Sequence, residues 1–353
     1  MKTLEQFMQK PKSIPAQTSW YLADLGEARG HQDLFTAQSP QMLKALREHA
    51  LIESAVSSNR IEGVTVDQRR VGTLVFGRPR LQSRDEEELC GYRDALNLVH
   101  AQGPRLPISE RTVLRLHAMA QGRVWDAGKY KDKDGDIVQT YPNGRVRVRF
   151  RTVAAAKTPD ALRRTLALWD DCLKERWVHP LIAVAGFDLD FLCIHPFRDG
   201  NGRVSRLLLL LQLHHLGYEV GRYISLERLI EENKDRYYET LEESSQRWHD
   251  GRHDPWPYVN YVLYVLKSAY REFEERAAAM KGRRGAKTEL VGAAVEAQAG
   301  DFSVVDLERV CPGVSRDMIR RVLREWKAAG KVECVGRGPG APWRKKGSIS
   351  KRG

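Results

Sequence analysis

The feature that most constrains the fold is a charged, glycine-containing loop directly before the most apolar segment of the chain. Residues 195–206 read HPFRDGNGRVSR, and residues 207–213 read LLLLLQL. A run of leucines is normally buried, but this one is far too short to span a bilayer. We therefore expect a buried helix that clamps the polar loop onto a rigid core.

The residue types in this loop suit phosphate chemistry. The turn Gly200-Asn201-Gly202 tolerates left-handed backbone, so its amides can point toward an anion at the start of a helix. Arg203 and Arg206 are three residues apart and share one helix face. Asp199 offers the hard oxygen that Mg²⁺ prefers, and His195 can act as a general base. Each element alone is usually structural, but their combination within one short segment favours a phosphate site.

The same segment resembles the signature of the Fic (filamentation induced by cAMP) family, HPFx[D/E]GNGRxxR, at every fixed position. It lacks the alanine and lysine that the related Doc-type kinases carry in place of the second glycine and the arginine. The resemblance implies that His195 deprotonates a hydroxyl that attacks the α-phosphorus of ATP. It further implies that Asp199 holds Mg²⁺, that Gly200, Asn201 and Gly202 cradle the phosphates, and that Arg203 and Arg206 contact the β- and γ-phosphates.

A second, shorter pattern resembles the inhibitory helix of the same family, [S/T]xxxE[G/N]. Ser58, Glu62 and Gly63 in SNRIEG meet it. Ser58 and Glu62 are four residues apart and face one side of a helix, and a carboxylate is a suitable partner for an arginine fork. The resemblance implies that Glu62 pairs with Arg206 in the space of the γ-phosphate and inhibits the enzyme. The alternative is a solvated carboxylate at a helix end.

Two further segments flank the predicted site. Valine and phenylalanine alternate with arginine over 145–151, after the turn dipeptides Asp134-Gly135 and Asn143-Gly144, and this pattern predicts a β-hairpin. The hairpin corresponds to the flap of Fic proteins, here 128–151, which pairs with the backbone of a target protein. Its arginines can equally be a charged face that protects an edge strand. Residues 233–246 resemble the helix that lines the adenine pocket, where Tyr238 and Glu242 are candidates for stacking and for contacting the base or ribose.

Helical periodicity dominates the rest of the chain and predicts an all-α Fic fold with a small hairpin, plus a C-terminal winged helix-turn-helix domain. Residues 1–40 give only short helical patterns. Longer amphipathic helices are expected at 40–63, 84–100, 109–122, 159–177, 179–194, 225–246 and 255–280. We divide the chain into an N-terminal helical region with the inhibitory motif 58–63 (1–108), a catalytic domain (109–280), and a basic linker followed by the winged helix (281–353).

The C-terminal domain carries most of the excess positive charge. From Lys281 onward there are 17 Lys and Arg against 8 Asp and Glu, a net charge of +9 out of +12 for the whole chain. Three helical segments followed by two short strands resemble a winged helix-turn-helix. The second helix of the helix-turn-helix, which follows Ser315, would be the recognition helix. It presents Arg316, Arg320, Arg321 and Arg324, and these arginines favour DNA as a partner. The alternative is a module for protein interaction or dimerisation.

Composition limits the class of protein. The 353 residues are 42% hydrophobic and 29% charged, as in an ordinary globular protein. The five cysteines are scattered without a CxxC pair and are read as reduced thiols, so a zinc site is not expected. The N-terminal residues lack the apolar core of a signal peptide. We therefore expect a cytoplasmic protein with no membrane segment.

These observations predict a protein adenylyltransferase, which transfers AMP from ATP to a hydroxyl of a target protein with Mg²⁺ and releases pyrophosphate. One alternative is a transcriptional regulator in which the Fic fold senses a nucleotide. A second is an enzyme of the same fold that uses another nucleotide donor. The identity of the target protein is left open, and the chain itself is one candidate. Whether the protein forms a homodimer is also left open.

Overall fold

The structure is a computed structural model that describes residues 2–9, 11, 13–36, 40–77, 80–140, 143–282, 286–296, 298, 300–311, 314–336, 338 and 340–346. It forms two compact units, one of Met1–Asp33 and His49–Phe273 and one of Leu34–Glu48 and Glu274–Gly353. The boundaries fall within α2, α3 and α12, whose limits are given below. The domain boundaries predicted at 108 and 280 stay a prediction.

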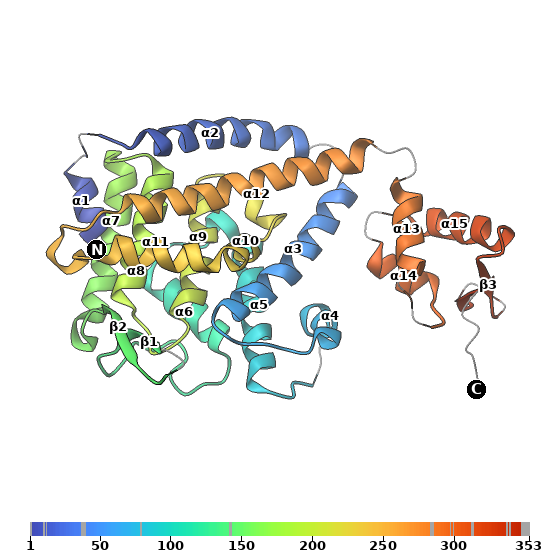
Figure 1. Cartoon of the computed structure of the whole chain (residues 1–353), viewed down its shortest axis with the longest axis horizontal. Coiled ribbons are helices and arrows are strands. Elements are labelled where there is room, and N and C mark those ends of the chain that lie inside the picture. Colours follow the sequence, from blue (N-terminus) through green and yellow to red (C-terminus); the bar gives the residue numbers. More distant parts are fainter. Residues whose placement is uncertain are drawn as a thin grey trace. The chain divides into compact units, whose positions relative to one another are not determined.

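The first unit is built mainly from helices, as predicted (Figure 1). Short 3₁₀ turns lie at Gly103–Arg105, Ala155–Lys157, Val220–Arg222 and Trp248–Asp250. The α-helices are α1 (Lys2–Met8), α2 (Ala16–Thr36), α3 (Pro40–Ile61), α4 (Gln68–Phe76), α5 (Arg84–Gln102), α6 (Glu110–Gln121), α7 (Thr158–Glu175), α8 (Pro180–Ile194), α9 (Asn201–His215), α10 (Leu226–Glu232), α11 (Lys234–Ser245) and α12 (Trp256–Gly282).

Helices α8 and α9 form the centre of this unit. Every residue of α8 from Leu181 to Ile194 is buried, and α9 is buried from Arg203 to His214. The leucine run therefore forms part of a helix surrounded by other helices, which is why it shows no polar face. The buried Asp190 of α8 accepts hydrogen bonds from the backbone N–H groups of Thr3 and Leu4 at 2.9 and 3.1 Å and from Trp248 Nε1 at 2.7 Å. These bonds fix α1 to the core.

The expectation of only short helices in residues 1–40 is wrong, because α2 has 21 residues. It runs beside α12 (Figure 1), where Thr18 Oγ1 donates to Asn260 Oδ1 at 2.7 Å and Lys267 Nζ to Asp24 Oδ2 at 2.6 Å. Packing against a neighbouring helix outweighs the weak periodicity of this segment. The sequence also did not predict α4, and the helix expected over 225–246 is divided into α10 and α11 at Asn233.

The predicted hairpin is present. Strands β1 (Asp136–Thr140) and β2 (Val146–Arg151) are antiparallel, with a register shift between Ile137 and Val138. Gly144 has a φ of +79°, as the turn requires. Tyr141 and Pro142 of the flap lie outside the described residues.

The second unit contains α13 (Ala286–Glu296), α14 (Val304–Val310) and α15 (Arg316–Ala328), followed by the antiparallel strands β3 (Val332–Cys334) and β4 (Trp343–Lys345). Phe302 forms an additional bridge to Trp343 of β4. Ser315 caps α15 by accepting from Met318 N, as predicted. The core comprises Val291, Val295, Phe302, Val304, Leu307, Cys311, Val314, Ile319, Val322, Leu323 and Val332. Residues 283–285 of the predicted linker lie outside the described residues.

Among the described helices, none combines the length and the apolar character that a membrane span needs. The five cysteines are free thiols, and four of them are buried.

Candidate active site

The loop between α8 and α9 is held rigidly by its own side chains. His195 ends α8 with a φ of +53°, and Gly200 precedes α9 with a φ of +78°. The buried side chain of Asn201 reaches back to Phe197, accepting from its N–H at 2.9 Å and donating to its carbonyl at 2.8 Å. Both the oxygen and the nitrogen of the Asn201 side-chain amide therefore form hydrogen bonds inside the loop. Its side chain shapes the predicted phosphate cradle, and contact with an anion is left to the backbone N–H groups of the first turn of α9.

Two residues outside the signature support this loop. His117 of α6 stacks on Phe197 with ring centroids 3.7 Å apart, and it accepts from the N–H of Gly128 at its Nδ1. Its Nε2 therefore carries the proton and donates to the carbonyl of Asp199 at 3.0 Å. Burial lowers the pKa of His117 to about 4. The neutral His117 ring therefore supports the loop by stacking on Phe197 and by its hydrogen bond to the Asp199 carbonyl.

Lys131 provides the second support. Its ammonium group is buried and donates to the carbonyl of Ile194 at 3.2 Å and to Thr152 Oγ1 at 2.8 Å. A cation at this position favourably meets the negative end of the α8 dipole. Burial lowers the pKa of Lys131 to about 8.

Glu62 lies over the first turn of α9. Its Oε1 accepts from Arg206 Nη2 at 2.8 Å, which is the contact that the resemblance implies. Arg206 also donates from Nε to Ser58 Oγ and from Nη2 to the Ser58 carbonyl, both at 2.9 Å. A Cβ atom on Gly202 would lie 2.2 Å from Glu62 Oε1. The carboxylate therefore occupies the position at the helix N-terminus where an anion is expected to bind.

A cavity of about 340 Å³ opens beside this carboxylate. That volume lies within the range of small-molecule sites. The cavity contains five of the residues singled out from the sequence, namely Glu62, His195, Gly202, Tyr238 and Glu242. Its other walls come from the flap, α8 and α11, and include Ile137, Val138, Gln139, Arg149, Phe150, Leu192, Cys193, Tyr237, Leu241 and Ser245.

His195 faces the cavity as a neutral imidazole. Its Nδ1 lies 3.3 Å from the carbonyl of Leu192, and a carbonyl can only accept, so the proton is on Nδ1 and Nε2 has a free lone pair. The pKa of His195 is lowered to about 4, mainly by burial and in smaller part by the charge of Lys131, against the raising effect of the Leu192 carbonyl. The residue is therefore ready to accept a proton at neutral pH.

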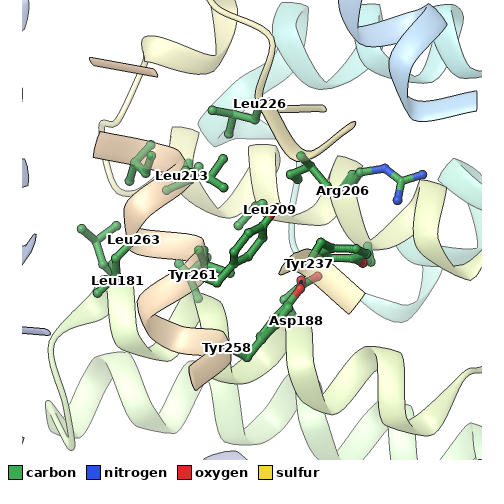
Figure 2. Close-up of a pocket in the computed structure, with 16 residues that line it drawn as sticks. Leu181, Asp188, Arg206, Leu209, Leu213, Leu226, Tyr237, Tyr258, Tyr261 and Leu263 are labelled. Atoms are coloured by element: carbon green, nitrogen blue, oxygen red, sulfur yellow. Dashed lines mark hydrogen bonds between the residues drawn. The ribbon is translucent and has the colours of Figure 1, made fainter. Parts of the chain in front are cut away.

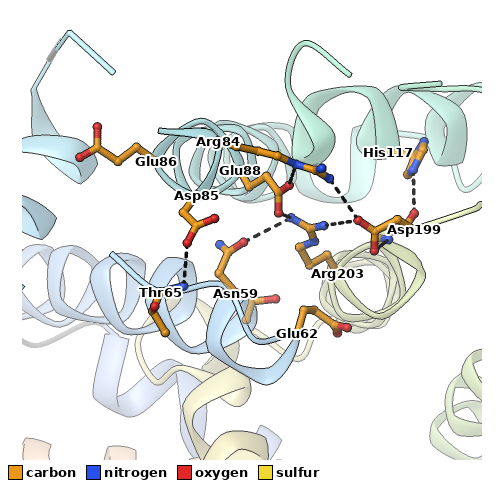
Figure 3. A network of polar contacts seen from close by, with 12 residues as sticks. Asn59, Glu62, Thr65, Arg84, Asp85, Glu86, Glu88, His117, Asp199 and Arg203 are labelled. Carbon is orange, nitrogen blue, oxygen red and sulfur yellow. Dashed lines mark hydrogen bonds and ion pairs between the residues drawn. The ribbon is translucent and has the colours of Figure 1, made fainter. Parts of the chain in front are cut away.

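The structure places Arg203 away from this cavity. Its side chain is 1% exposed and forms an ion pair with the equally buried Glu88 of α5 at 2.6 Å (Figure 3). Asn59 Oδ1 accepts a further bond from Arg203 at 3.4 Å. Arg203 thus joins α9 to α3 and α5. Like Asp199 and Arg206, it is not among the residues that line the cavity, and its contact with a β-phosphate stays a prediction.

Asp199 is the remaining predicted ligand. Its side chain is 57% exposed, and its Oδ2 lies 3.5 Å from Arg203 Nη2 and 3.6 Å from Arg84 Nη2 (Figure 3). Within the described residues no three His, Cys, Asp or Glu side chains form a cage for a metal ion. Mg²⁺ is commonly held by one or two carboxylates together with substrate phosphates. The residues present therefore fit a Mg²⁺ ion that binds together with a phosphate ligand.

A second, smaller cavity of about 20 Å³ lies behind Arg206 (Figure 2). It is bordered mainly by leucine and tyrosine side chains, with Asp188 at one end, where the Tyr258 hydroxyl donates to Asp188 Oδ2 at 2.5 Å. The cavity is too small for a nucleotide. Its lining side chains pack around the buried Arg206 and do not form a binding site.

One face of α11 contacts both the end of α3 and the flap. Lys234 Nζ donates to the carbonyl of Ile61, the last residue of α3, at 2.7 Å, and the Tyr238 hydroxyl lies 3.5 Å from the same carbonyl. Glu242 pairs with Arg147 at 2.7 Å and with Arg149 at 3.0 Å. Positions 234, 238 and 242 are spaced by four, so they form one stripe on the helix.

Several of these residues were not singled out from the sequence. His117, Lys131, Glu88 and Lys234 come from separate elements, and no local pattern marks them. The spacing of Lys234 from Tyr238 and Glu242 was the one available signal.

The four predicted DNA-contacting arginines lie on the exposed side of α15 in the second unit. Three of them have acidic neighbours within that unit: Arg316 pairs with Glu308 at 2.7 Å, Arg320 with Asp317 at 3.9 Å and Arg321 with Glu325 at 3.5 Å. Arg324 donates to the carbonyl of Arg320 at 3.3 Å. Their positive charge is therefore partly compensated.

Part of the chain is similar in sequence to known proteins. Residues 107–213 match the model of the Fic/DOC family. The chain is 25% identical over 185 residues to "Protein adenylyltransferase Fic" of Drosophila willistoni, covering 50% of this chain and 34% of that protein. It is 23% identical over 207 residues to the protein of the same name from Nematostella vectensis, covering 56% and 45%. The chain thus spans less than half the length of these curated relatives.

Solved structures agree on the fold. A Fic family protein from Desulfovibrio desulfuricans G20 superposes with a TM-score of 0.61 at 24% identity, over 96% of this chain and 98% of that chain. A Fic domain containing signaling protein from Bacteroides thetaiotaomicron gives a TM-score of 0.60 at 21% identity, over 72% and 97%. With the family match and the signature loop, these likenesses identify the chain as a Fic domain protein.

The buried pair of Arg203 and Glu88 leads to a stability prediction. We expect Glu88→Gln to lower the free energy of unfolding by about 3 kcal/mol, because it removes the nearest counter-charge of a buried guanidinium and leaves only the exposed Asp199 at 3.5 Å. Urea denaturation of the full chain measures this. The matched control is the neighbouring Glu87→Gln, which should change stability by no more than about 0.5 kcal/mol. Equal effects of the two substitutions would contradict the role assigned to the pair.

Proposed function

We propose that this Fic domain protein is a protein adenylyltransferase that Glu62 inhibits. The observation that carries the proposal is the placement of the Glu62 carboxylate between Gly202 and Arg206, in a cavity that also exposes a neutral His195. A carboxylate that lies against Gly202 in the first turn of a helix and accepts a hydrogen bond from an arginine is an internal anion. The site is therefore built for an anionic ligand with a base beside it.

In the proposed reaction, a hydroxyl oxygen of the target attacks the α-phosphorus of ATP. The new P–O bond forms as the bond to the bridging oxygen breaks, pyrophosphate leaves, and His195 Nε2 takes the hydroxyl proton. The amides at the start of α9 and Arg206 stabilise the phosphate charge, which is how such transfers are mainly catalysed. Asp199 is the residue that would hold Mg²⁺, which supplies further charge neutralisation on the phosphates when bound.

Names of relatives support this choice of reaction at a coarse level, since proteins 25% identical over half of the chain are called adenylyltransferases. Two other functions compete with it. A nucleotide-sensing regulator would bind ATP without transferring AMP, and an enzyme with another donor would transfer a different nucleotide.

The test is transfer of label from α-labelled ATP. Glu62→Gly should increase labelling of a target, or of the protein itself, by about tenfold or more, the factor expected from losing a charge-assisted hydrogen bond to the inhibitory carboxylate. Glu62→Gly combined with His195→Ala should return to background. The isosteric Glu62→Gln is the matched control and should give an intermediate level. If the Glu62→Gly protein binds ATP but transfers no label, the sensor is favoured.

The lowered pKa of His195 sets the pH dependence of the reaction. The neutral form is the base, so kcat/KM should stay constant from neutral pH down to about pH 5 and fall as the pH passes through about 4. In the Glu62→Gly protein the fall should come slightly lower, since Glu62 raises the pKa of His195. Lys131→Gln should move the fall to higher pH, because it removes a positive charge. A fall centred near 6.5 in the Glu62→Gly protein would contradict the assignment.

A second function is proposed for the second unit, a winged helix-turn-helix that binds DNA. The arrangement of α13, α14 and α15 before β3 and β4, together with the exposed arginine side of α15, favours it. Dimerisation is the alternative.

Salt titration of DNA binding by the full chain tests this second function. Arg321→Ala with Arg324→Ala should reduce the slope of log K against log salt by about 2, because each arginine that no longer neutralises a phosphate lowers the slope by about one unit. Arg316→Ala should change the slope less, because Glu308 already neutralises that arginine. If DNA binding did not depend on salt concentration, or if the protein formed a dimer without affinity for DNA, dimerisation would be favoured over DNA binding.

A further inference from the structure

Glu242 was expected to contact the base or ribose, yet its carboxylate is engaged on the flap. Oε1 accepts from Arg147 Nη2 at 2.7 Å, and Oε2 lies 3.0 Å from Arg149 Nη2. Each carboxylate oxygen of Glu242 therefore pairs with one guanidinium group. The Glu242 side chain is 20% exposed, so its bonds are partly shielded from water. Shielding strengthens charge-assisted hydrogen bonds relative to those at a fully exposed surface.

The two arginines belong to one face of β2, because residues two apart in a strand point the same way. The base of the flap is fixed independently of them. Lys131 N donates to the Pro196 carbonyl at 3.0 Å, His249 Nε2 lies 2.7 Å from the Arg151 carbonyl, and Phe150 stacks on His249. Toward the tip, Val138, Val146 and Val148 are exposed. Glu242 therefore meets the flap between an anchored base and a tip where these three valines are only partly covered.

Arg149 also faces the cavity. It lines the cavity wall together with Glu242, and its buried Nε has no hydrogen-bond partner among the described residues. Its position therefore depends on Glu242, and so does the width of the space between β2 and α11.

We propose that Glu242 is a latch that holds the flap against α11 through Arg147 and Arg149 and thereby sets the opening of the cavity. Lys234 and Tyr238, on the same stripe of α11, hold the end of the inhibitory helix α3. One helix therefore contacts both α3 and the flap at the site. In this role Glu242 is a positioning residue, and its contact with the flap is separate from any contact with a nucleotide.

Hydrogen exchange of the full chain, followed by mass spectrometry, tests the latch without requiring activity. In Glu242→Gln, peptides that cover 136–151 should exchange about tenfold faster than in the wild type, the factor expected from losing one charge-assisted hydrogen bond. Peptides of α8 should remain unchanged. Arg147→Ala, on an exposed strand where loss of the fold is not at issue, should accelerate the same peptides. The charge-matched control Arg145→Ala should not, since the ion pairs of Glu242 are with Arg147 and Arg149.

Two further measurements separate a latch from other roles. High salt should accelerate exchange of the flap in the wild type but not in Glu242→Gln. Exchanging the charges, with Glu242→Arg, Arg147→Glu and Arg149→Glu together, should restore protection. Unchanged flap exchange in both Glu242→Gln and Arg147→Ala would overturn the proposal. The same holds if Glu242→Gln weakens ATP binding in calorimetry while the flap stays protected, which would make Glu242 a nucleotide ligand only.

Discussion

Arg206 is a buried cation, and the arrangement of the site follows from the need to compensate it. With 3% of its side chain exposed, the guanidinium requires hydrogen bonds and a counter-charge. Ser58 of α3 and Glu62, which directly follows α3, supply them at Nε and Nη2, whereas the buried Nη1 has no hydrogen-bond partner among the described residues. A phosphate group can likewise accept hydrogen bonds and supply a negative charge. Under the proposed function, the carboxylate and a phosphate would compete for one position, and the placement of α3 would depend on what occupies the first turn of α9.

Features confined to one continuous segment could be predicted from the sequence. The loop before α9, the hairpin turns and the pairing of Ser58 with Glu62 on one helix face all depend on neighbouring residues. The family resemblance then supplied the partner of Glu62, which spacing alone could not identify. By contrast, Arg203 and Asn201 have the residue types of phosphate ligands, but their partners Glu88 and Phe197 engage them within the fold. Helical periodicity shows that a side chain is buried and does not show against which residue.

The flap shows the same limit in a different form. Alternating arginines on β2 could protect a free edge or face an acidic partner, and the sequence offers no means to choose. The structure supplies the partner from α11, nearly a hundred residues further along the chain. Long helices raise a related difficulty. α2 has little periodicity of its own, and its contacts with α12 through Thr18 and Asp24 account for its length.

Charged groups beside the cavity are paired with opposite charges, Arg206 with Glu62, and both Arg147 and Arg149 with Glu242. From a distance such a pair is a dipole, whose field falls off faster than that of a single charge. Such pairs therefore attract a polyanion in solution less strongly than the same arginines would without their carboxylates. Selectivity then arises after entry, when a ligand must exchange places with a carboxylate that the protein already holds there.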